Sequence, residues 1–164
     1  MRLLLIRHAI AVPSGTSGVE DDERPLTSRG RKRFRAAARG LARIMDRPDV
    51  LLTSPLPRAA ETAEIAADAF GKVEPRHERA LARGGTDAII AVLRRQPRDA
   101  TVAIVGHEPT LSQLLARLLG SHRAERFAFK KGGAALVELP TEGRSAGRLV
   151  WFLKPRLLRD LAED

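Results

Sequence analysis

The chain has 164 residues, of which 43% are hydrophobic and 30% charged, and its formal net charge is +9. This length fits one domain spanning residues 1–164, large enough to bury roughly 70% of the surface of the unfolded chain. Cysteine is absent, which excludes a disulfide framework, a thiolate metal site and a cysteine nucleophile. No apolar stretch approaches the length of a membrane span or a signal-peptide core, so we expect a cytoplasmic protein without a membrane partner.

Apolar runs of strand length alternate with longer segments of helical periodicity, the pattern of an α/β fold. The first run, Leu3 to Ile6, is unbroken, which predicts a central strand covered on both faces. The expected elements, in chain order, are strand 2–7, loop 9–25, helix 28–46 capped by Thr27 or Ser28, strand 50–53, helix 58–70, extended segment 73–76, helix 86–95, strand 101–105, helix 109–120, short strands 127–129, 134–139 and 149–153, and helical turns 155–161.

The last three short strands are joined by Gly132-Gly133 and by residues Thr141 to Gly147, which favours antiparallel additions at the edge of the sheet. The earlier strands alternate with helices, which favours parallel pairing. We therefore expect a three-layer α/β/α sandwich with a mostly parallel central sheet and antiparallel edge additions. No linker, repeat or low-complexity segment interrupts this pattern.

Imidazole and guanidinium side chains follow three of the predicted parallel strands. The three strand ends read Arg7-His8, Ser54-Pro55-Leu56-Pro57-Arg58-Ala59-Ala60-Glu61-Thr62 and Gly106-His107. Ligands bind outside the carboxyl ends of the strands in such sheets, so these residues are expected to share one pocket. Two cations and two imidazoles suit a phosphoryl group, with one imidazole as nucleophile. Phosphoryl transfer is therefore the leading hypothesis from the residues alone.

Each of these residue types has a defined use in that chemistry. A neutral His8 attacks phosphorus through one ring nitrogen if the other is engaged as a donor. Arg7 and Arg58 offer planar forks that match phosphate oxygens, and Arg58 opens a helix, where the macrodipole favours an anion over a cation. His107 is placed to donate to a phosphoryl oxygen. The alternatives are structural histidines, a surface salt bridge for Arg7 and a solvent-facing Arg58.

The positive charge is the one unusual bulk property and invites a nucleic-acid hypothesis. Seven basic residues lie on the helix predicted at 28–46, where a solvated polar face explains them. Aromatic residues make up only 4% of the chain and tyrosine is absent, so platforms for base stacking are scarce. We expect no nucleic-acid partner, and attraction of an acidic protein or a phosphorylated substrate is the preferred use of the charge.

Cofactor motifs are missing from the sequence. His107-Glu108 is not followed by a histidine at zincin spacing, and His77 and His122 stand in separate loops, so we expect no metal site. There is no phosphate-binding loop with lysine, no nucleophile elbow and no dinucleotide fingerprint. These absences weaken the hypotheses of a nucleotide-driven enzyme and of a serine hydrolase.

Together, the motifs at the three strand ends resemble those of the histidine phosphatase (phosphoglycerate-mutase-like) superfamily. The segment Arg24-Pro25-Leu26-Thr27 and the small size resemble the short SixA-type phosphohistidine phosphatases in particular. The resemblance implies a phosphohistidine intermediate on His8, a phosphoryl-oxygen site formed by Arg7, Arg58 and His107, a further contact from Arg24, and neither metal nor organic cofactor.

Two positions depart from the superfamily pattern. Ala9 stands where a glycine is usual, which a small residue tolerates unless the backbone needs a positive φ. The glutamate acid that larger members carry after the second helix has no counterpart in the stretch Leu81 to Gly85. An alkoxide leaving group needs a proton more than an imidazole does, so this absence favours phosphohistidine over a sugar phosphate. The remaining candidates for a proton donor are Asp21, Asp22, Glu78 and Glu108.

Three hypotheses follow. The preferred one is a monomeric phosphatase acting on a histidine-phosphorylated protein, such as a phosphorelay or phosphotransfer protein in signal transduction, with phosphate or vanadate as a ligand. The second is a broad phosphomonoesterase or mutase acting on small phosphate esters. The third is a non-catalytic basic module that binds nucleic acid or an acidic partner.

Overall fold

The computed structural model describes residues 1–140 and 146–163. Its strands are β1 (Arg2–Arg7), β2 (Val50–Thr53), β3 (Pro75–His77), β4 (Thr101–Gly106), β5 (Ala134–Glu138) and β6 (Arg148–Leu153). Its helices are α1 (Ser28–Ile44), α2 (Pro57–Ala69), α3 (Ala80–Arg83), α4 (Gly85–Arg94), α5 (Thr110–Leu118) and α6 (Pro155–Asp160), with 3-10 turns η1 (Asp21–Glu23) and η2 (Ala124–Phe127).

The strands form a single sheet in the order β3-β2-β4-β1-β5-β6. The first four in this order run parallel, whereas β5 is antiparallel to β1 and β6 is antiparallel to β5. The expected mostly parallel sheet with antiparallel edge additions is therefore confirmed. β1 lies at the centre because its residues Leu3 to Ile6 are apolar on both faces, and all four are completely buried.

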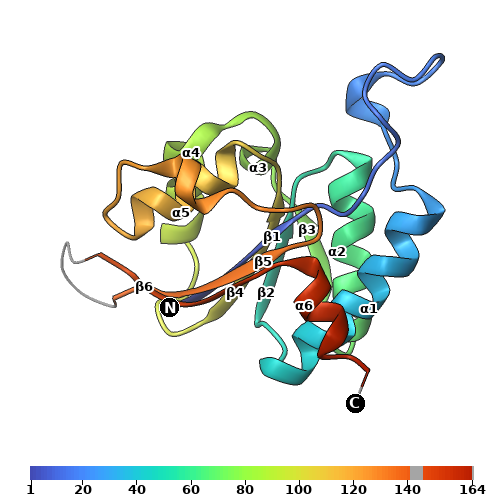
Figure 1. Cartoon of the computed structure of the whole chain (residues 1–164). Coiled ribbons are helices and arrows are strands. Elements are labelled where there is room, and N and C mark those ends of the chain that lie inside the picture. Colours follow the sequence, from blue (N-terminus) through green and yellow to red (C-terminus); the bar gives the residue numbers. More distant parts are fainter. Residues whose placement is uncertain (141–145, 164) are drawn as a thin grey trace.

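Helices cover both faces of the sheet, which confirms the three-layer α/β/α sandwich. On one face, Leu4 and Ile6 of β1 belong to a core cluster shared with α1, α2 and α6. On the other face, Leu3 and Leu5 belong to a second cluster shared with α4 and α5. Figure 1 shows these two helical layers on either side of the sheet, with the connection from β1 to α1 projecting beyond it.

The connection from β1 to α1 is fixed by hydrogen bonds and close packing at its end next to α1. Thr27 caps α1, as expected, by accepting a hydrogen bond from the Gly30 amide through Oγ1 at 2.9 Å. A Cβ atom at Gly30 would lie only 2.1 Å from the Ile10 carbonyl oxygen, so glycine is required for this close approach. Glu61 of α2 accepts a hydrogen bond from the Leu26 amide. These contacts fix the segment that follows His8.

Two differences from the expected elements have local causes. The predicted strand 127–129 is wrong, because the chain forms η2 and then an irregular segment in which Phe129 is buried against Phe152, with ring centroids 4.7 Å apart. The short helix α3 was not expected, since four residues carry too little periodicity to be detected. Residues 141–145 of the predicted connection 141–147 lie outside the described residues.

Among residues 1–140 and 146–163, no helix is long and apolar enough to cross a membrane.

Candidate active site

The carboxyl ends of β1 and β4 place two imidazoles beside each other. The strands pair in parallel with Arg7 opposite Gly106, so the next residue of each strand, His8 and His107, emerges at the same level. Their ring centroids lie 5.2 Å apart, close to the separation of neighbouring strands. Strand register therefore places the two rings next to each other.

His8 is held as a neutral imidazole with a defined tautomer. Its Nδ1 lies 2.7 Å from the carbonyl oxygen of Ala9, which can only accept, so Nδ1 carries the proton. Nε2 makes no hydrogen bond within the described residues and keeps its lone pair. The side chain is 5% exposed, and burial lowers the pKa of His8 to about 3, with smaller contributions from His107, Arg58 and Arg7. His8 therefore stays a neutral imidazole at neutral pH, with its one proton on Nδ1.

His107 is held by Ser54, at the end of β2. Its Nε2 lies 2.7 Å from the Ser54 hydroxyl, which also accepts from the Leu56 amide at 3.2 Å. In the tautomer in which the Ser54 hydroxyl donates to Nε2, the proton of His107 lies on Nδ1, which is buried without a partner. Burial lowers the pKa of His107 to about 4, with further lowering by Arg58, Arg24 and Arg7. A buried N–H donor of this kind suits an oxygen acceptor of a ligand.

The guanidinium groups of Arg7 and Arg58 are anchored at one nitrogen each. Nη1 of Arg7 donates to the Phe129 carbonyl oxygen at 2.6 Å, and Nη1 of Arg58 donates to that of Asp21 at 3.0 Å. Burial is the main cause that lowers the pKa of both groups, yet an arginine remains protonated. Each keeps donors that the protein does not use.

Unpaired buried donors are concentrated at this place. Only four buried side-chain nitrogen or oxygen atoms of the described residues have no hydrogen-bond partner, and three of them belong to Arg7, Arg58 and His107. Buried donors are normally paired, since an unpaired one costs about 1–3 kcal/mol. A cluster of them beside a neutral nucleophile is arranged for an anion with several oxygen acceptors.

Arg24 lies at the rim of this cluster. Its Nε donates to Asp21 Oδ1 at 2.8 Å and its Nη1 to the Val12 carbonyl oxygen at 2.9 Å. Its positive charge contributes to the lowered pKa of His107 and of Arg58, which places it near both. No hydrogen bond links it to the four central residues. The structure thus brings Arg7, His8, Arg58 and His107 together, with Arg24 beside them.

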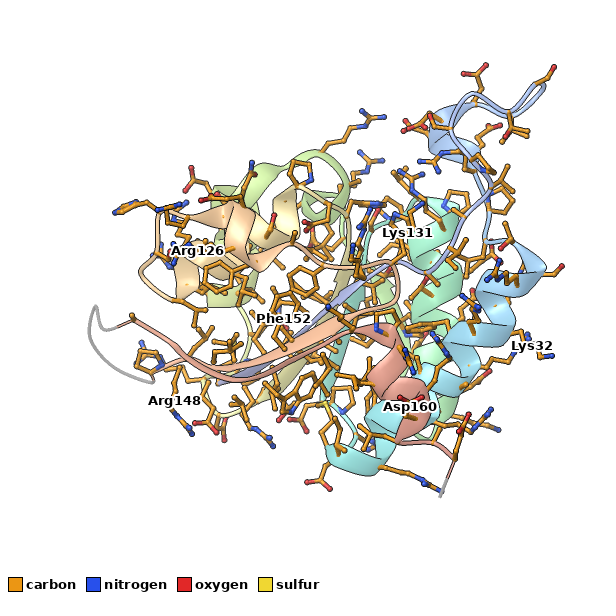
Figure 2. All side chains as sticks on the ribbon, in the orientation of Figure 1. Lys32, Arg126, Lys131, Arg148, Phe152 and Asp160 are labelled. Atoms are coloured by element: carbon orange, nitrogen blue, oxygen red, sulfur yellow. The ribbon has the colours of Figure 1, made fainter. Side chains whose placement is uncertain are left out.

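Lys131 was not singled out from the sequence. The amide of the next residue, Gly132, donates to the carbonyl oxygens of Arg7 and His8 at 3.1 Å, which fixes this turn against the end of β1. Burial is the main cause that lowers the pKa of Lys131, and the charges of Arg7, Arg24 and Arg58 lower it further. The sequence signal that could have indicated Lys131 is the run Lys130-Lys131-Gly132-Gly133, which directly precedes β5. Figure 2 shows Lys131 on the side of the sheet that carries α1 and α6.

Thr62 joins the segments that carry His8 and Arg58. Its hydroxyl is fully buried, accepts from the Ala9 amide at 3.0 Å and donates to the Arg58 carbonyl oxygen at 2.6 Å. We expect Thr62→Val to lower the free energy of unfolding by about 1–3 kcal/mol and to lower kcat, because the Ala9 amide loses its partner. Urea denaturation and steady-state kinetics measure both effects. Thr62→Ser retains the hydroxyl and should restore most of kcat, and equal kcat in both variants would contradict this role.

The buried His8 and the partly buried His107 predict an acid-sensitive fold. Their pKa values of about 3 and about 4 lie below the ordinary value of 6.5, so the unfolded state binds more protons than the folded state below pH 6.5. Stability is therefore fully present above pH 6.5 and is lost progressively as the pH falls through about 4 and toward about 3. We expect the urea midpoint of a His8→Asn variant to fall less steeply between pH 7 and pH 4.5. His122→Asn, at an exposed site, should keep the slope of the intact protein, and an unchanged slope in His8→Asn would contradict this account.

Asp21 is poorly suited to donate a proton. It accepts hydrogen bonds from the Ser14 hydroxyl and from Arg24, each at 2.8 Å. The bond from Ser14 lowers the pKa of this carboxyl most, and the charges of Arg24 and Arg58 lower it further. Asp21 is therefore ionised at neutral pH.

The other three candidate acids are each engaged in an ion pair or in hydrogen bonds. Asp22 forms an ion pair with Arg83. Glu78 accepts from the Ala80 amide at 3.3 Å, and Glu108 accepts from the amides of Ser112 and Phe129. No group of three or more histidine or carboxylate side chains among residues 1–140 and 146–163 is placed to share a metal ion.

An α/β/α sandwich that brings two neutral imidazoles and an array of buried cationic donors to the carboxyl ends of its strands is typical of enzymes that transfer phosphoryl groups through histidine. Residues 3–83 match the family described as histidine phosphatase superfamily, branch 1. The chain belongs to the histidine phosphatase superfamily and is a phosphatase of that superfamily.

The solved structures similar to this chain include structures of SixA. The structure of the protein histidine phosphatase SixA complexed with tungstate has a TM-score of 0.84 and 25% identity, covering 96% of this chain and 99% of that one. The structure of the proposed phosphohistidine phosphatase SixA of Agrobacterium tumefaciens has a TM-score of 0.79 and 26% identity, and the match covers 94% of this chain and 97% of that one. An uncharacterized protein of Picosynechococcus sp. is 35% identical over 136 residues, covering 81% of this chain and 82% of that protein.

Proposed function

We propose that this protein hydrolyses phosphohistidine on a protein substrate through a covalent phosphohistidine intermediate on His8. The observation that carries the proposal is the buried imidazole of His8, whose Nδ1 donates to the Ala9 carbonyl while Nε2 stays unprotonated. Unpaired donors of Arg7, Arg58 and His107 surround it. The similarity to SixA structures supports the choice of substrate class.

In the first step Nε2 of His8 attacks phosphorus, and the bond between phosphorus and the substrate imidazole breaks. A phosphohistidine that carries a proton on its second ring nitrogen leaves as neutral imidazole, so no proton needs to be supplied. In the second step water attacks phosphorus, the bond to His8 breaks and its electron pair returns to Nε2. Both protons of the water leave with dihydrogen phosphate.

The cationic residues stabilise the phosphoryl group as it moves between the two imidazoles. Arg7 and Arg58 supply charge-assisted hydrogen bonds to its oxygens, and His107 Nδ1 supplies a neutral one. Arg24 and Lys131 add positive potential at the rim. Because these groups are held by the fold before a ligand arrives, little reorganisation is needed in the transition state.

The carboxylates near the site favour a phosphoramidate over an ester. Hydrolysis of an ordinary ester creates an alkoxide, which needs a proton from a general acid. Asp21 is held ionised, and Asp22, Glu78 and Glu108 are engaged in ion pairs or hydrogen bonds. A leaving imidazole does not require such an acid. The same geometry therefore supports phosphohistidine as substrate and gives no support to a mutase.

The decisive experiment compares substrates on the intact protein. We expect phosphate release from a histidine-phosphorylated protein with a kcat/KM at least about a hundredfold above that for simple esters such as p-nitrophenyl phosphate. A preference for esters would overturn the proposal in favour of a phosphomonoesterase. No turnover of any phosphorylated compound would favour a binding module. His122→Ala, an exposed substitution, serves as the control for handling and purity.

Vanadate should inhibit the protein competitively. Its trigonal-bipyramidal oxyanion resembles the transferring phosphoryl group, so it is expected to bind about a hundredfold or more tighter than phosphate. A related oxyanion, tungstate, is bound in the SixA complex. Inhibition constants for vanadate and phosphate test this, with sulfate at equal ionic strength as the control. Indifference to vanadate would contradict the oxyanion site.

A further inference from the structure

A strongly basic depression adjoins the candidate active site. It encloses about 270 Å³, and its charged lining consists of six basic residues and no acidic one. We call it the basic hollow and define it by Arg33, Lys130, Lys131, Lys154, Arg156 and Arg159. The first is on α1, the next two precede β5, and the last three lie at the start of α6 or along it. Three segments distant in sequence thus contribute cations to one surface.

The floor of the basic hollow is apolar and closely packed. Phe34 and Ala37 of α1 and Ala9 line it and are almost completely buried. A Cβ atom at Gly132 would lie 3.3 Å from the Phe34 ring, so the turn before β5 packs directly on this floor. The cations around the rim therefore stand on a preformed surface and need no rearrangement to meet a partner.

The cations of the basic hollow are not paired with carboxylates in the part of the chain that the structure describes. None of the six residues forms an ion pair among the residues that the structure describes. The neighbouring charges of Arg29 and Arg159 contribute to a lowered pKa of Arg33. The opposite flank of α1 is different, because there the arginines share a depression with acids of α2: Arg31, Arg35 and Arg39 with Glu61, Glu64 and Asp68.

The basic hollow lies close to residues of the candidate active site. Ala9, on its floor, follows His8 directly and accepts the hydrogen bond from His8 Nδ1. Lys131, on its rim, is close enough to Arg7, Arg24 and Arg58 for their charges to lower its pKa. The basic hollow therefore lies next to the segment that carries His8.

We propose that the basic hollow binds acidic side chains of the phosphoprotein substrate that flank its phosphohistidine. The proposal rests on the phosphatase function proposed above and adds the determinant of substrate choice. Cations on a solvent-exposed surface steer an oppositely charged partner and raise its association rate, with a strong dependence on salt.

The test uses two histidine-phosphorylated peptides of equal length, one with glutamates flanking the phosphohistidine and one with glutamines. The intact protein is expected to favour the acidic peptide by about tenfold in kcat/KM, mainly through KM. Raising the salt from 50 to 300 mM should shrink this preference, because exposed charges are screened. The variant R33E/K154E/R156E should lose the preference while hydrolysing the small compound phosphoramidate at the rate of the intact protein.

The matched control is R94E/R95E/R126E, which changes the net charge equally on the layer of α4 and η2. Figure 2 shows Arg126 on the opposite side of the molecule from Lys131. This control should keep the preference for the acidic peptide. Equal rates on both peptides with the intact protein, or a preference that survives in R33E/K154E/R156E, would overturn the docking proposal alone. Failure of the intact protein to hydrolyse either peptide or any histidine-phosphorylated protein would overturn the proposed function as well.

Discussion

A His8→Ala variant is expected to lose phosphatase activity by about a thousandfold or more, because removal of a nucleophile leaves only the binding contribution of the site. In the intact protein, rapid quenching during turnover of a ³²P-labelled substrate should trap the label on His8. The label should be lost in acid and retained in base, as expected for a phosphoramidate. Peptide mapping of the quenched protein identifies the residue.

The control for this experiment is His122→Ala, which removes an exposed imidazole and should keep both the rate and the label. Label on a different side chain, or full activity in His8→Ala, would contradict the covalent mechanism. Loss of activity together with loss of the folded state would be uninformative, so the circular dichroism spectrum of each variant is compared first. His8→Asn, which fills more of the buried volume, provides a second test.

Arg58→Ala is expected to lower kcat/KM by about a hundredfold to a thousandfold without lowering the thermal midpoint. The loss follows from removing a preorganised donor to the phosphoryl oxygens. The midpoint is expected to stay level or rise, since burial and the nearby charge of Arg24 both disfavour the charged form of Arg58 and lower its pKa. Kinetics and differential scanning calorimetry on the same preparation separate these two effects.

Arg58→Lys is the informative companion variant. Lysine retains the charge but has no planar fork, so most of the catalytic loss should persist. Recovery of the full rate in Arg58→Lys would mean that charge alone is required. A marked drop of the thermal midpoint in Arg58→Ala would instead assign Arg58 a structural role through its hydrogen bond to the Asp21 carbonyl.

Much of the fold was predictable because its strands are short, apolar and separated by helices. Leu3 to Ile6 has no polar residue, so it had to be buried on both faces, and the structure places it at the centre of the sheet. Parallel pairing then brings the residues after β1 and β4 side by side. The juxtaposition of His8 and His107 follows from that rule, whereas their catalytic roles remain predictions that the variants above address.

Other features depend on contacts that no local pattern encodes. The segment 127–129 has strand-like composition. However, Phe129 is buried in the core and its carbonyl oxygen accepts a hydrogen bond from Arg7, so this segment does not pair with the sheet. Lys131 reaches the site because Gly132 is hydrogen-bonded to the end of β1, a contact between residues more than a hundred positions apart. The partners of Ser54 and Thr62 likewise become visible only when the strands are assembled.

The two imidazoles follow the innermost parallel strands, β1 and β4, each of which is hydrogen-bonded to a strand on both sides. Amide protons in such wholly covered strands exchange with deuterium only when the entire molecule opens. Heat inactivation should therefore coincide with global unfolding, rather than precede it as in enzymes whose reactive groups sit on fraying loops. The phosphatase rate can then serve as a direct gauge of how much protein in a sample is native.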